Sequence, residues 1–422
     1  MSSHKIFTLF FTAPRPNLHV CYNSIIQEDS MNQQYRNLTI SQRIAKAVSD
    51  SGGRVFYVGG YVRDKILDRN SKDIDIEIHG LTESRLTEIL GTFGEVLTMG
   101  ASFGVFGLRH YTLDIVMPRS LVTGEIDPFV GYREAARRRD FTMNALMQDV
   151  LTGEILDYFG GVDDIRRGVI RLVDSNTFLL DALRVIRAAR FAAVLGFTVD
   201  DGTREICAAA DISRLAKERV YSELETALTK SPAPSRFFTE LSLMRQISAW
   251  FPEVPSADTD ILDMAAGVRE KSSYMAGFML AMLCHGLPQS QTERLLSRLT
   301  NDSRLTKYVL NMSALSDVLA GMNDDSPELS FLRVFDEAES PEDLPLMSGI
   351  LTGDSHSDIL RLYRERMSLP AVTGADLLRN GAATGPEIGG ALRHVHSLRL
   401  MGVPKAVQLL EALDYIRRGN HD

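Results

Sequence analysis

The feature that most limits the fold of this chain is a change of pattern near Asp174. From about Arg54 to Val173, short β-branched runs alternate with segments of helical period. After Asp174 the β-type runs disappear, and Leu-, Ala- and Arg-rich helical segments separated by Gly and Pro follow one another. This change predicts an α/β head in front of a long all-helical part. A chain of 422 residues also suits two or more domains in series rather than one core.

The predicted strands of the head differ in their patterns. Arg54–Val58 is typical of a buried strand and is ended by Gly59–Gly60, whereas Ile74–Ile78 alternates with acids at period two. Val105–Leu108 and Tyr111–Met117 are typical of the two strands of a hairpin. Two further segments have helical period: Glu134–Met147 and Leu179–Val194.

Bulk composition excludes some classes of function. The net charge of −9 argues against a polyanionic partner, although arginine gathers locally. The arginine clusters are Arg137–Arg139, Arg166 with Arg167 and Arg171, and Arg184 with Arg187 and Arg190. Each cluster suits a solvated helix face as well as an RNA contact. No apolar run approaches the roughly 20 residues that span a bilayer, so we expect no membrane partner.

The ends of the chain and its cysteines add two expectations. Ile6–Phe11 is too short for a signal peptide, and Met31 opens a helical run, so we expect residues 1–30 to be a disordered or mis-assigned extension without a role. Cys21, Cys207 and Cys284 are far apart and form neither a disulfide framework nor a zinc site. Buried, reduced cysteines predict a cytoplasmic location.

The first motif that carries chemistry is Gly59–Asp64, which reads G-G-Y-V-R-D. It follows a predicted strand and opens a predicted helix. Glycines there allow the backbone to approach a phosphate, and a helix start offers free N–H groups. A diglycine turn of this kind is as well explained by an ordinary turn as by a phosphate site.

The second motif is a pair of acids, Asp73 and Asp75, on the predicted strand that follows. Carboxylates two apart on a strand point to the same side, and two like charges so close are costly unless a cation lies between them. Mg²⁺ is bound by one or two carboxylates completed by water and substrate phosphates. Asp114, on a neighbouring predicted strand, is a candidate third carboxylate. The alternative is an exposed strand face, which Glu77 would also suit.

These two motifs resemble the opening of class II tRNA nucleotidyltransferases and bacterial poly(A) polymerases, which belong to the DNA polymerase beta-like superfamily. Further segments match the family's motifs in the same order. They are Arg138–Ala145, Asp157–Ile165, Asp181–Phe191 and Glu218–Leu224, and weaker similarity returns at Thr373–Leu378 and Gly385–Gly389. The resemblance therefore covers residues 57–228 and part of the C-terminal region.

The resemblance implies an α+β fold: a nucleotidyltransferase head with a mostly antiparallel sheet, followed by helical neck, body and tail. The corresponding ranges are 31–173 for the head, 174–235 for the base-selecting neck, and 236–422 for the body and tail that bind tRNA. It implies that Asp73, Asp75 and Asp114 are catalytic, and that Asp73 and Asp75 hold Mg²⁺. The implied nucleotide-binding residues of the head are Gly59, Gly60, Arg63, Arg138, Asp140 and Asn144.

The helix that carries Asp181 and Arg184 is expected to choose the base. Residues three apart share a helical face, so a carboxylate and a guanidinium can face the amine and the acceptor of cytosine or adenine together. The resemblance implies that they select CTP and then ATP, with Arg187 and Arg190 also binding the nucleotide. The alternative is an intrahelical ion pair worth only ~0.3–0.5 kcal/mol. The family usually has a glutamate where this chain has Leu180, which leaves the rigidity of the template open.

The implied function is template-independent addition of CCA to the tRNA 3′ end from CTP and ATP. Several alternatives remain open. Full CCA-adding members usually carry a longer flexible loop than Ser120–Arg137, and a shortened loop marks enzymes that add only CC. The alternative is harmless length variation, since surface loops tolerate deletions. A poly(A) polymerase is disfavoured by the acidic charge and by the lack of a basic C-terminal extension. A non-catalytic RNA-binding relative is the third alternative, and the oligomeric state is not predicted.

Overall fold

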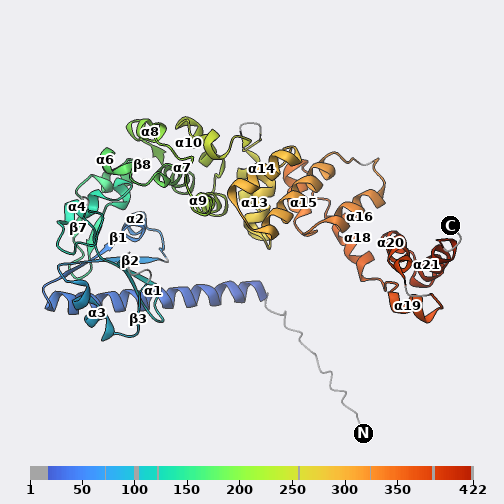
Figure 1. Cartoon of the computed structure of the whole chain (residues 1–422), viewed down its shortest axis with the longest axis horizontal. Helices are drawn as coiled ribbons and strands as arrows, with labels where there is room; N and C mark the ends of the chain where they lie inside the picture. Colours follow the sequence, from blue (N-terminus) through green and yellow to red (C-terminus); the bar gives the residue numbers. More distant parts are fainter. Residues whose placement is uncertain are drawn as a thin grey trace, which may run out of the picture. The chain divides into compact units, whose positions relative to one another are not determined.

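The computed structural model describes residues 18–71, 73–98, 104–120, 123–254, 257–323, 325–382 and 385–419. The chain divides into two compact units, Met1–Leu180 and Asp181–Asp422 (Figure 1). The first unit ends after the predicted head boundary at Val173, because the helix that follows packs back onto the head. Phe178 lies edge-on to Phe141 at 5.7 Å. The finer division into neck, body and tail remains a prediction.

Within the described part of the first unit, seven strands form one sheet in the order β3-β4-β5-β2-β1-β6-β7. Only the pairing of β2 with β5 is parallel, which confirms a mostly antiparallel sheet. The strands of this sheet are β1 (Arg54–Val58), β2 (Ile74–His79), β3 (Val96–Thr98), β4 (Val105–Leu108), β5 (Leu113–Val116), β6 (Met147–Asp149) and β7 (Ile155–Leu156), and the short β8 (Val169–Ile170) follows. The predicted strands at Arg54–Val58 and Ile74–Ile78 and the predicted hairpin are thereby confirmed.

The helices of the first unit cover the sheet. They are α1 (Leu18–Asp50), α2 (Gly60–Ile66), α3 (Glu83–Gly91), α4 (Tyr132–Arg137), the 3₁₀ turn η1 (Thr142–Asn144), α5 (Gly161–Arg167) and α6 (Ser175–Phe178). Helix α1 packs on β1 and α3, and its residues Ile40, Ile44 and Val48 are buried at a spacing of four. Elsewhere, Phe56 and Val58 of β1 share a core cluster with Ala136 of α4.

Two expectations for the head were wrong. Residues 18–30, expected to be disordered, belong to α1, whose sequence from Leu18 to Asp50 contains neither Gly nor Pro; residues 1–17 lie outside the described part. The predicted helix Glu134–Met147 ends at Arg137. Asp140 interrupts it, because its carboxylate accepts the N–H of Phe141 at 2.7 Å and its carbonyl accepts the N–H of Val173 at 3.2 Å.

The second unit is helical in its described residues apart from the two-residue strand β9 (Thr198–Val199). Its helices are α7 (Leu183–Leu195), α8 (Asp201–Ala208), α9 (Lys217–Lys230), α10 (Ser235–Leu243), α11 (Ile247–Trp250), α12 (Ile261–Ala266), the 3₁₀ turn η3 (Arg269–Lys271), α13 (Met275–Leu283), α14 (Gln289–Leu299), α15 (Ser303–Ala320), α16 (Glu328–Glu337), α17 (Leu344–Leu351), α18 (Ser357–Ser368), α19 (Gly374–Arg379), α20 (Pro386–Leu400) and α21 (Lys405–Gly419). None of the described helices is long and apolar enough to span a bilayer.

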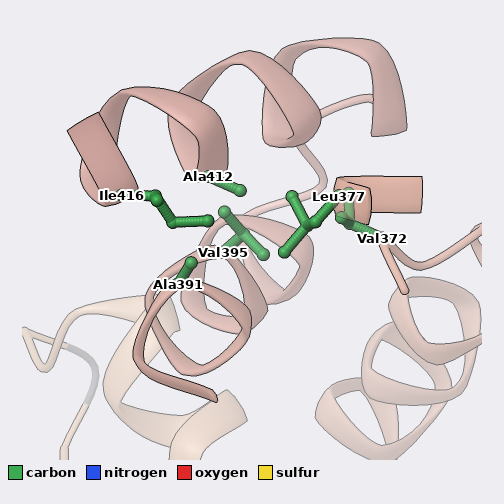
Figure 2. Packing of buried hydrophobic residues seen from close by; sticks show 6 residues of the cluster. All are labelled: Val372, Leu377, Ala391, Val395, Ala412 and Ile416. Atoms are coloured by element: carbon green, nitrogen blue, oxygen red, sulfur yellow. The ribbon is translucent and has the colours of Figure 1, made fainter. Parts of the chain in front are cut away.

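The C-terminal helices α19, α20 and α21 enclose a small core of their own. Figure 2 shows its six buried side chains, which are Val372, Leu377, Ala391, Val395, Ala412 and Ile416. The Thr373 side chain caps α19 in a reciprocal capping box with Asp376. The segment Thr373–Leu378 therefore has a local structural role as a helix start, and contact with tRNA at this segment remains a prediction.

Candidate active site

The candidate active site lies where β2 is flanked by β1 and β5. Asp75 of β2 is in parallel register with Asp114 of β5 and opposite Val58 of β1. Residues in register on neighbouring strands project to the same face, so the two carboxylates lie on one side of the sheet. Asp73 lies two residues earlier, directly before β2. The structure thus brings together the three acids that the sequence singled out.

The electrostatics of these acids favour a bound cation. Burial, and then the charges of Asp114 and Asp73, raise the pKa of Asp75 to about 6, while Arg139 acts in the opposite direction. Asp73 and Asp114 themselves are exposed. A carboxylate whose ionised form is disfavoured by burial and by neighbouring carboxylates is stabilised when a cation joins the group.

The donor set fits a hard divalent cation that shares its ligands with a substrate. Among the residues that the structure describes, no three His, Cys, Asp or Glu side chains are placed to enclose a metal ion by themselves. Mg²⁺ is commonly bound in such incomplete sites, with one or two carboxylates and the oxygens of substrate phosphates. The carboxylates of β2 and β5 are thus the candidate protein ligands of such an ion.

Glu77 has a different role from Asp75, although both lie on the same face of β2. The Glu77 carboxylate is 6% exposed, accepts a hydrogen bond from Arg139 Nη2 at 2.8 Å and pairs with His79 Nε2 at 2.9 Å. Burial alone would raise the pKa of Glu77, but Arg139 and His79 lower it overall. Glu77 is thus buried and does not suit an exposed strand face, and its pairing with Arg139 and His79 was not predicted from the sequence.

Gly59 brings the backbone close to these charges. It has φ 67° and ψ −133°, directly before α2 begins at Gly60. A Cβ atom at this position would lie 3.5 Å from Arg139 Nη1 and 3.7 Å from Asp75 Oδ2. The positive φ favours glycine, and a methyl group here would be in van der Waals contact with Arg139 and the Asp75 carboxylate.

We expect Gly59→Ala to weaken both folding and catalysis. Strain at the positive φ costs about 1–2 kcal/mol, and the methyl group lies against Asp75 and Arg139. Thermal unfolding and the rate of nucleotide transfer measure the two effects. Gly124→Ala is the matched control, because Gly124 also has a positive φ but nothing lies within 4 Å of its Cβ position. Equal losses of transfer in the two variants would contradict a specific role of Gly59 beside Asp75.

Three of the predicted nucleotide-binding residues form one buried network. Arg63 Nη1 donates to Asn144 Oδ1 at 2.9 Å, and Asn144 Nδ2 donates to Asp140 Oδ1 at 2.9 Å. Arg63 also donates to Asp64 at 2.7 Å. The exposed fractions of Arg63, Asn144 and Asp140 are only 8%, 5% and 7%. The network fixes the start of α2 to η1, and contact of these side chains with a nucleotide remains a prediction.

An arginine-rich cleft of about 160 Å³ lies beside the acids in the same unit, and we call it the arginine cleft. Its charged lining residues are Glu77, Arg119, Arg138 and Arg139. Arg138 Nη1 donates to the carbonyl of Ser120 at 2.9 Å. Burial, and then the nearby Arg119, lower the pKa of Arg138. Three half-buried arginines thus line the same small space.

The segment expected to be one flexible loop, Ser120–Arg137, is partly ordered. A bridge between Arg119 and Ile126 closes a tight turn, and Arg119 Nη1 donates to the carbonyl of Gly124 at 3.1 Å. Helix α4 then occupies Tyr132–Arg137. The segment Ser120–Arg137 therefore ends in a helix, which begins close to the helix start predicted at Glu134; residues 121–122 lie outside the described part.

The predicted base-selecting residues lie in the second unit, on or next to α7. The Asp181 carboxylate accepts the N–H of Leu183 at 3.1 Å and forms an ion pair with Arg219 of α9 at 2.8 Å. The first contact explains why α7 begins at Leu183 rather than at the predicted Leu179, because the carboxylate satisfies a free N–H of the first turn. Leu180, in place of the family's glutamate, is 74% exposed.

The arginines of α7 are also held by α9. Glu223 pairs with Arg190 at 2.7 Å and with Arg187 at 3.4 Å. The guanidinium of Arg190 lies 3.6 Å from the centre of the Phe191 ring. Arg219 and Glu223 are four residues apart and thus share one face of α9. The motif Glu218–Leu224 therefore positions the side chains of α7, a role that the sequence left unassigned.

We expect Arg219→Ala to impair the choice of base more than the chemical step. Without Arg219, the Asp181 carboxylate loses one of the two contacts that hold its orientation. The lost ion pair is worth only about 1 kcal/mol, because both side chains are partly exposed. Competition between CTP and UTP for incorporation measures the effect, and we expect the preference for C to fall several-fold. Arg214→Ala, which removes an exposed arginine paired with Asp211, is the control. An unchanged preference in Arg219→Ala would contradict the positioning role.

The head and the chain as a whole both have counterparts among known proteins. Residues 55–171 match the family described as Poly A polymerase head domain. The CCA-adding enzyme of Leuconostoc mesenteroides is 29% identical over 390 residues, which cover 86% of this chain and 92% of that protein. The multifunctional CCA protein of Stenotrophomonas maltophilia is 34% identical over 57% of this chain, but the match spans just under two thirds of its length, 65%.

Solved structures share the fold. The CCA-adding enzyme of Bacillus stearothermophilus in complex with CTP superposes with a TM-score of 0.72 at 23% identity, covering 90% of this chain and 98% of that one. The Thermotoga maritima enzyme complexed with tRNA has a TM-score of 0.68 at 23% identity, with 89% and 94% covered. The chain is therefore similar to a CCA-adding enzyme over most of its length, and its head is similar to the poly(A) polymerase head domain, in line with the resemblance of its ordered motifs.

Proposed function

We propose that this protein adds CCA to the 3′ end of tRNA from CTP and ATP without a nucleic-acid template. The observation that carries the proposal is the pair Asp75 and Asp114, in register beside the Gly59 turn, in a head of the poly(A) polymerase type. The match to the CCA-adding enzyme of Leuconostoc mesenteroides covers most of that protein's length. A poly(A) polymerase and a non-catalytic relative are both less well supported by this combination.

The reaction transfers a nucleotidyl group. The 3′ hydroxyl oxygen of tRNA attacks the α-phosphorus of the nucleoside triphosphate, the bond to the bridging oxygen of the β-phosphate breaks, and pyrophosphate leaves in line. We infer that Asp73, Asp75 and Asp114 hold the divalent cation, and that it is Mg²⁺. A divalent cation held by these acids would lower the pKa of the attacking hydroxyl and neutralise charge on the leaving group.

The protein's own groups orient the two substrates. The Gly59–Gly60 turn brings the backbone beside Asp75, where we propose that the triphosphate binds, and Arg139 adds a positive charge there. The network of Arg63, Asn144 and Asp140 orders the side of the site where we infer that the sugar binds. We further propose that Asp181 and Arg184 read the base, with Arg187 and Arg190 held beside them by Glu223.

Nucleotide choice tests the proposal. Purified protein, Mg²⁺ and a tRNA that ends at its discriminator base are incubated with CTP alone, ATP alone or UTP alone. We expect two additions with CTP and no efficient addition with ATP or UTP. A long run of A from ATP alone would contradict the proposal in favour of a poly(A) polymerase.

The free, buried thiols of Cys207 and Cys284 suit the cytoplasmic location that we also propose.

A further inference from the structure

Helix α1 is hydrogen-bonded to both segments that lead into the acidic strands. Asn37 Nδ2 donates to the carbonyl of Thr112 at 2.9 Å and to the Thr112 hydroxyl at 2.8 Å. Gln34 Nε2 donates to the carbonyl of Ser71 at 3.0 Å. Thr112 and Ser71 each lie two residues before a candidate metal ligand. Two side chains of one helix thus hold the approaches to two of the three acids.

The two segments lie at the same end of a parallel strand pair. Strands β2 and β5 run in parallel with Asp75 in register with Asp114, and each of the two segments lies before the start of its strand. Parallel strands are not joined by a tight hairpin that would fix their register. A shift of the pairing by one residue would turn one carboxylate to the other face of the sheet. The bonds from α1 oppose such a shift at both strands.

The bonded side chain of Asn37 is fully buried and fully satisfied. Its exposed fraction is 0%, and its side-chain oxygen accepts a hydrogen bond from Gln33 Nε2 at 3.2 Å. Its Nδ2 atom carries two N–H groups, which suit the two acceptors of Thr112. A buried amide with all its partners in place has one preferred orientation, and this makes it a rigid support for the chain that it holds.

The second support extends to an acid itself. The hydroxyl of Ser71, whose carbonyl accepts from Gln34, donates to the carbonyl of Asp73 at 3.1 Å. Gln34 and Asn37 are three residues apart, so they share one face of α1. The two supports therefore act from neighbouring positions on the same rigid element.

We propose that Asn37 and Gln34 of α1 are positioning residues for nucleotidyl transfer. They hold Asp114 and Asp73 at the distance from Asp75 at which the acids share one divalent cation with the substrate phosphates. This role rests on the proposed function, which assigns the cation to these acids. The competing explanation is that the bonds from α1 contribute only to the stability of the head.

The test separates cation binding from stability. Asn37→Ala and Gln34→Ala are compared with the wild type by calorimetric titration with CTP, in the presence and in the absence of Mn²⁺. Transfer of CMP to a tRNA without CCA is followed as a function of Mg²⁺ concentration, and thermal unfolding measures stability. Ser41→Ala is the matched control. Ser41 is also fully buried on α1, but its hydroxyl shares a hydrogen bond of 2.6 Å with the hydroxyl of Tyr57 in β1, a strand that carries none of the three acids.

We expect Asn37→Ala to weaken CTP binding about 10-fold in the presence of Mn²⁺, because loss of a group that orients a metal ligand commonly costs this much in affinity. CTP binding without Mn²⁺ should be unchanged. The Mg²⁺ concentration for half-maximal transfer should rise by the same factor, while the KM for tRNA stays constant, since the buried Asn37 offers no surface to RNA. Gln34→Ala removes one bond instead of two and should act in the same direction, but less. Ser41→Ala should lower the melting temperature without changing the effect of either cation.

Three outcomes would overturn the positioning role. A lower melting temperature of Asn37→Ala with an unchanged Mn²⁺ effect would reduce the bonds from α1 to a structural role. An equal loss of the Mn²⁺ effect in Ser41→Ala would show that loosening of α1 as a whole is the cause. If Asn37→Ala does not fold, an unchanged Mn²⁺ effect in Gln34→Ala would have the same meaning.

Failure of the proposed function is distinguishable from failure of the positioning role. A wild type that transfers no CMP to tRNA would contradict the proposed function. In that case, a strengthening of CTP binding by Mn²⁺ that is lost in Asn37→Ala would still support the positioning role. A wild type whose CTP binding does not respond to Mn²⁺ would overturn the positioning role as well.

Discussion

Asp75→Asn is expected to abolish nucleotide transfer while leaving the head folded. The substitution removes one carboxylate from the pair that faces the cation, and the lost charge stabilisation of several kcal/mol corresponds to a fall in kcat of about 10³-fold or more. Single-turnover transfer of CMP to tRNA measures this rate. Asp50→Asn is the control, because it removes an exposed carboxylate of the same unit paired with Lys46.

The stability of Asp75→Asn separates catalysis from folding. Because burial and the neighbouring acids raise the pKa of Asp75 to about 6, protonation of this group favours the folded state. The negative charge of Asp75 destabilises the folded state. This destabilisation develops as the pH rises from the pKa of Asp75 in the unfolded chain through about 6, and it is fully present at pH 7. We therefore expect the metal-free variant to unfold at the same temperature as the wild type or higher. A large loss of stability would indicate that Asp75 is a structural residue.

Glu77→Ala is expected to destabilise the head by about 3 kcal/mol. The substitution leaves Arg139 without its ion-pair partner at a site where the two side chains are 21% and 8% exposed, and it also removes the partner of the buried His79 Nε2. Chemical denaturation measures the loss. Because Arg139 also faces Asp75, transfer activity should fall as well. Glu77→Gln retains a hydrogen-bond acceptor and should lose less stability than Glu77→Ala.

The control for Glu77→Ala is another glutamate–arginine pair of the same unit. Glu88 pairs with Arg85 at 2.9 Å, but both side chains are more than half exposed. Glu88→Ala should therefore change the free energy of unfolding by no more than about 0.5 kcal/mol. The two substitutions should also differ in the pH dependence of their effects. Arg139 and His79 lower the pKa of Glu77. The stability that the Glu77 carboxylate contributes is therefore present at neutral pH and is lost in acid, as the pH falls through this lowered pKa. Equal effects of the two substitutions would refute the burial argument.

The parts of the head that were predictable from sequence are those with a local signal. The apolar run of β1, the alternation in β2 and the glycine turn after β1 specify their own conformation. The spacing of Asp73 and Asp75 likewise places both on one side of a strand. The resemblance of the ordered motifs to a known family, rather than spacing alone, led to the proposed function.

The parts that could not be predicted depend on partners far away in sequence. The parallel pairing of β2 with β5, which sets Asp114 beside Asp75, carries no signal in either strand. The bond between Glu77 and Arg139 spans 62 residues, and that between Asp181 and Arg219 spans 38. The helical pattern also wrongly predicted a helix through Asp140. The backbone of this segment pairs instead with Arg171 and Val173, and this pairing overrides the local preference for helix.

The most direct test of the central claim is the length of the product at single-nucleotide resolution. A tRNA ending at its discriminator base is incubated with the wild-type protein, Mg²⁺, CTP and ATP, and the 3′ end is sequenced. The proposed function predicts growth by three nucleotides, with the sequence CCA. Growth that stops after CC, a long tail of A, or no growth at all would each contradict it.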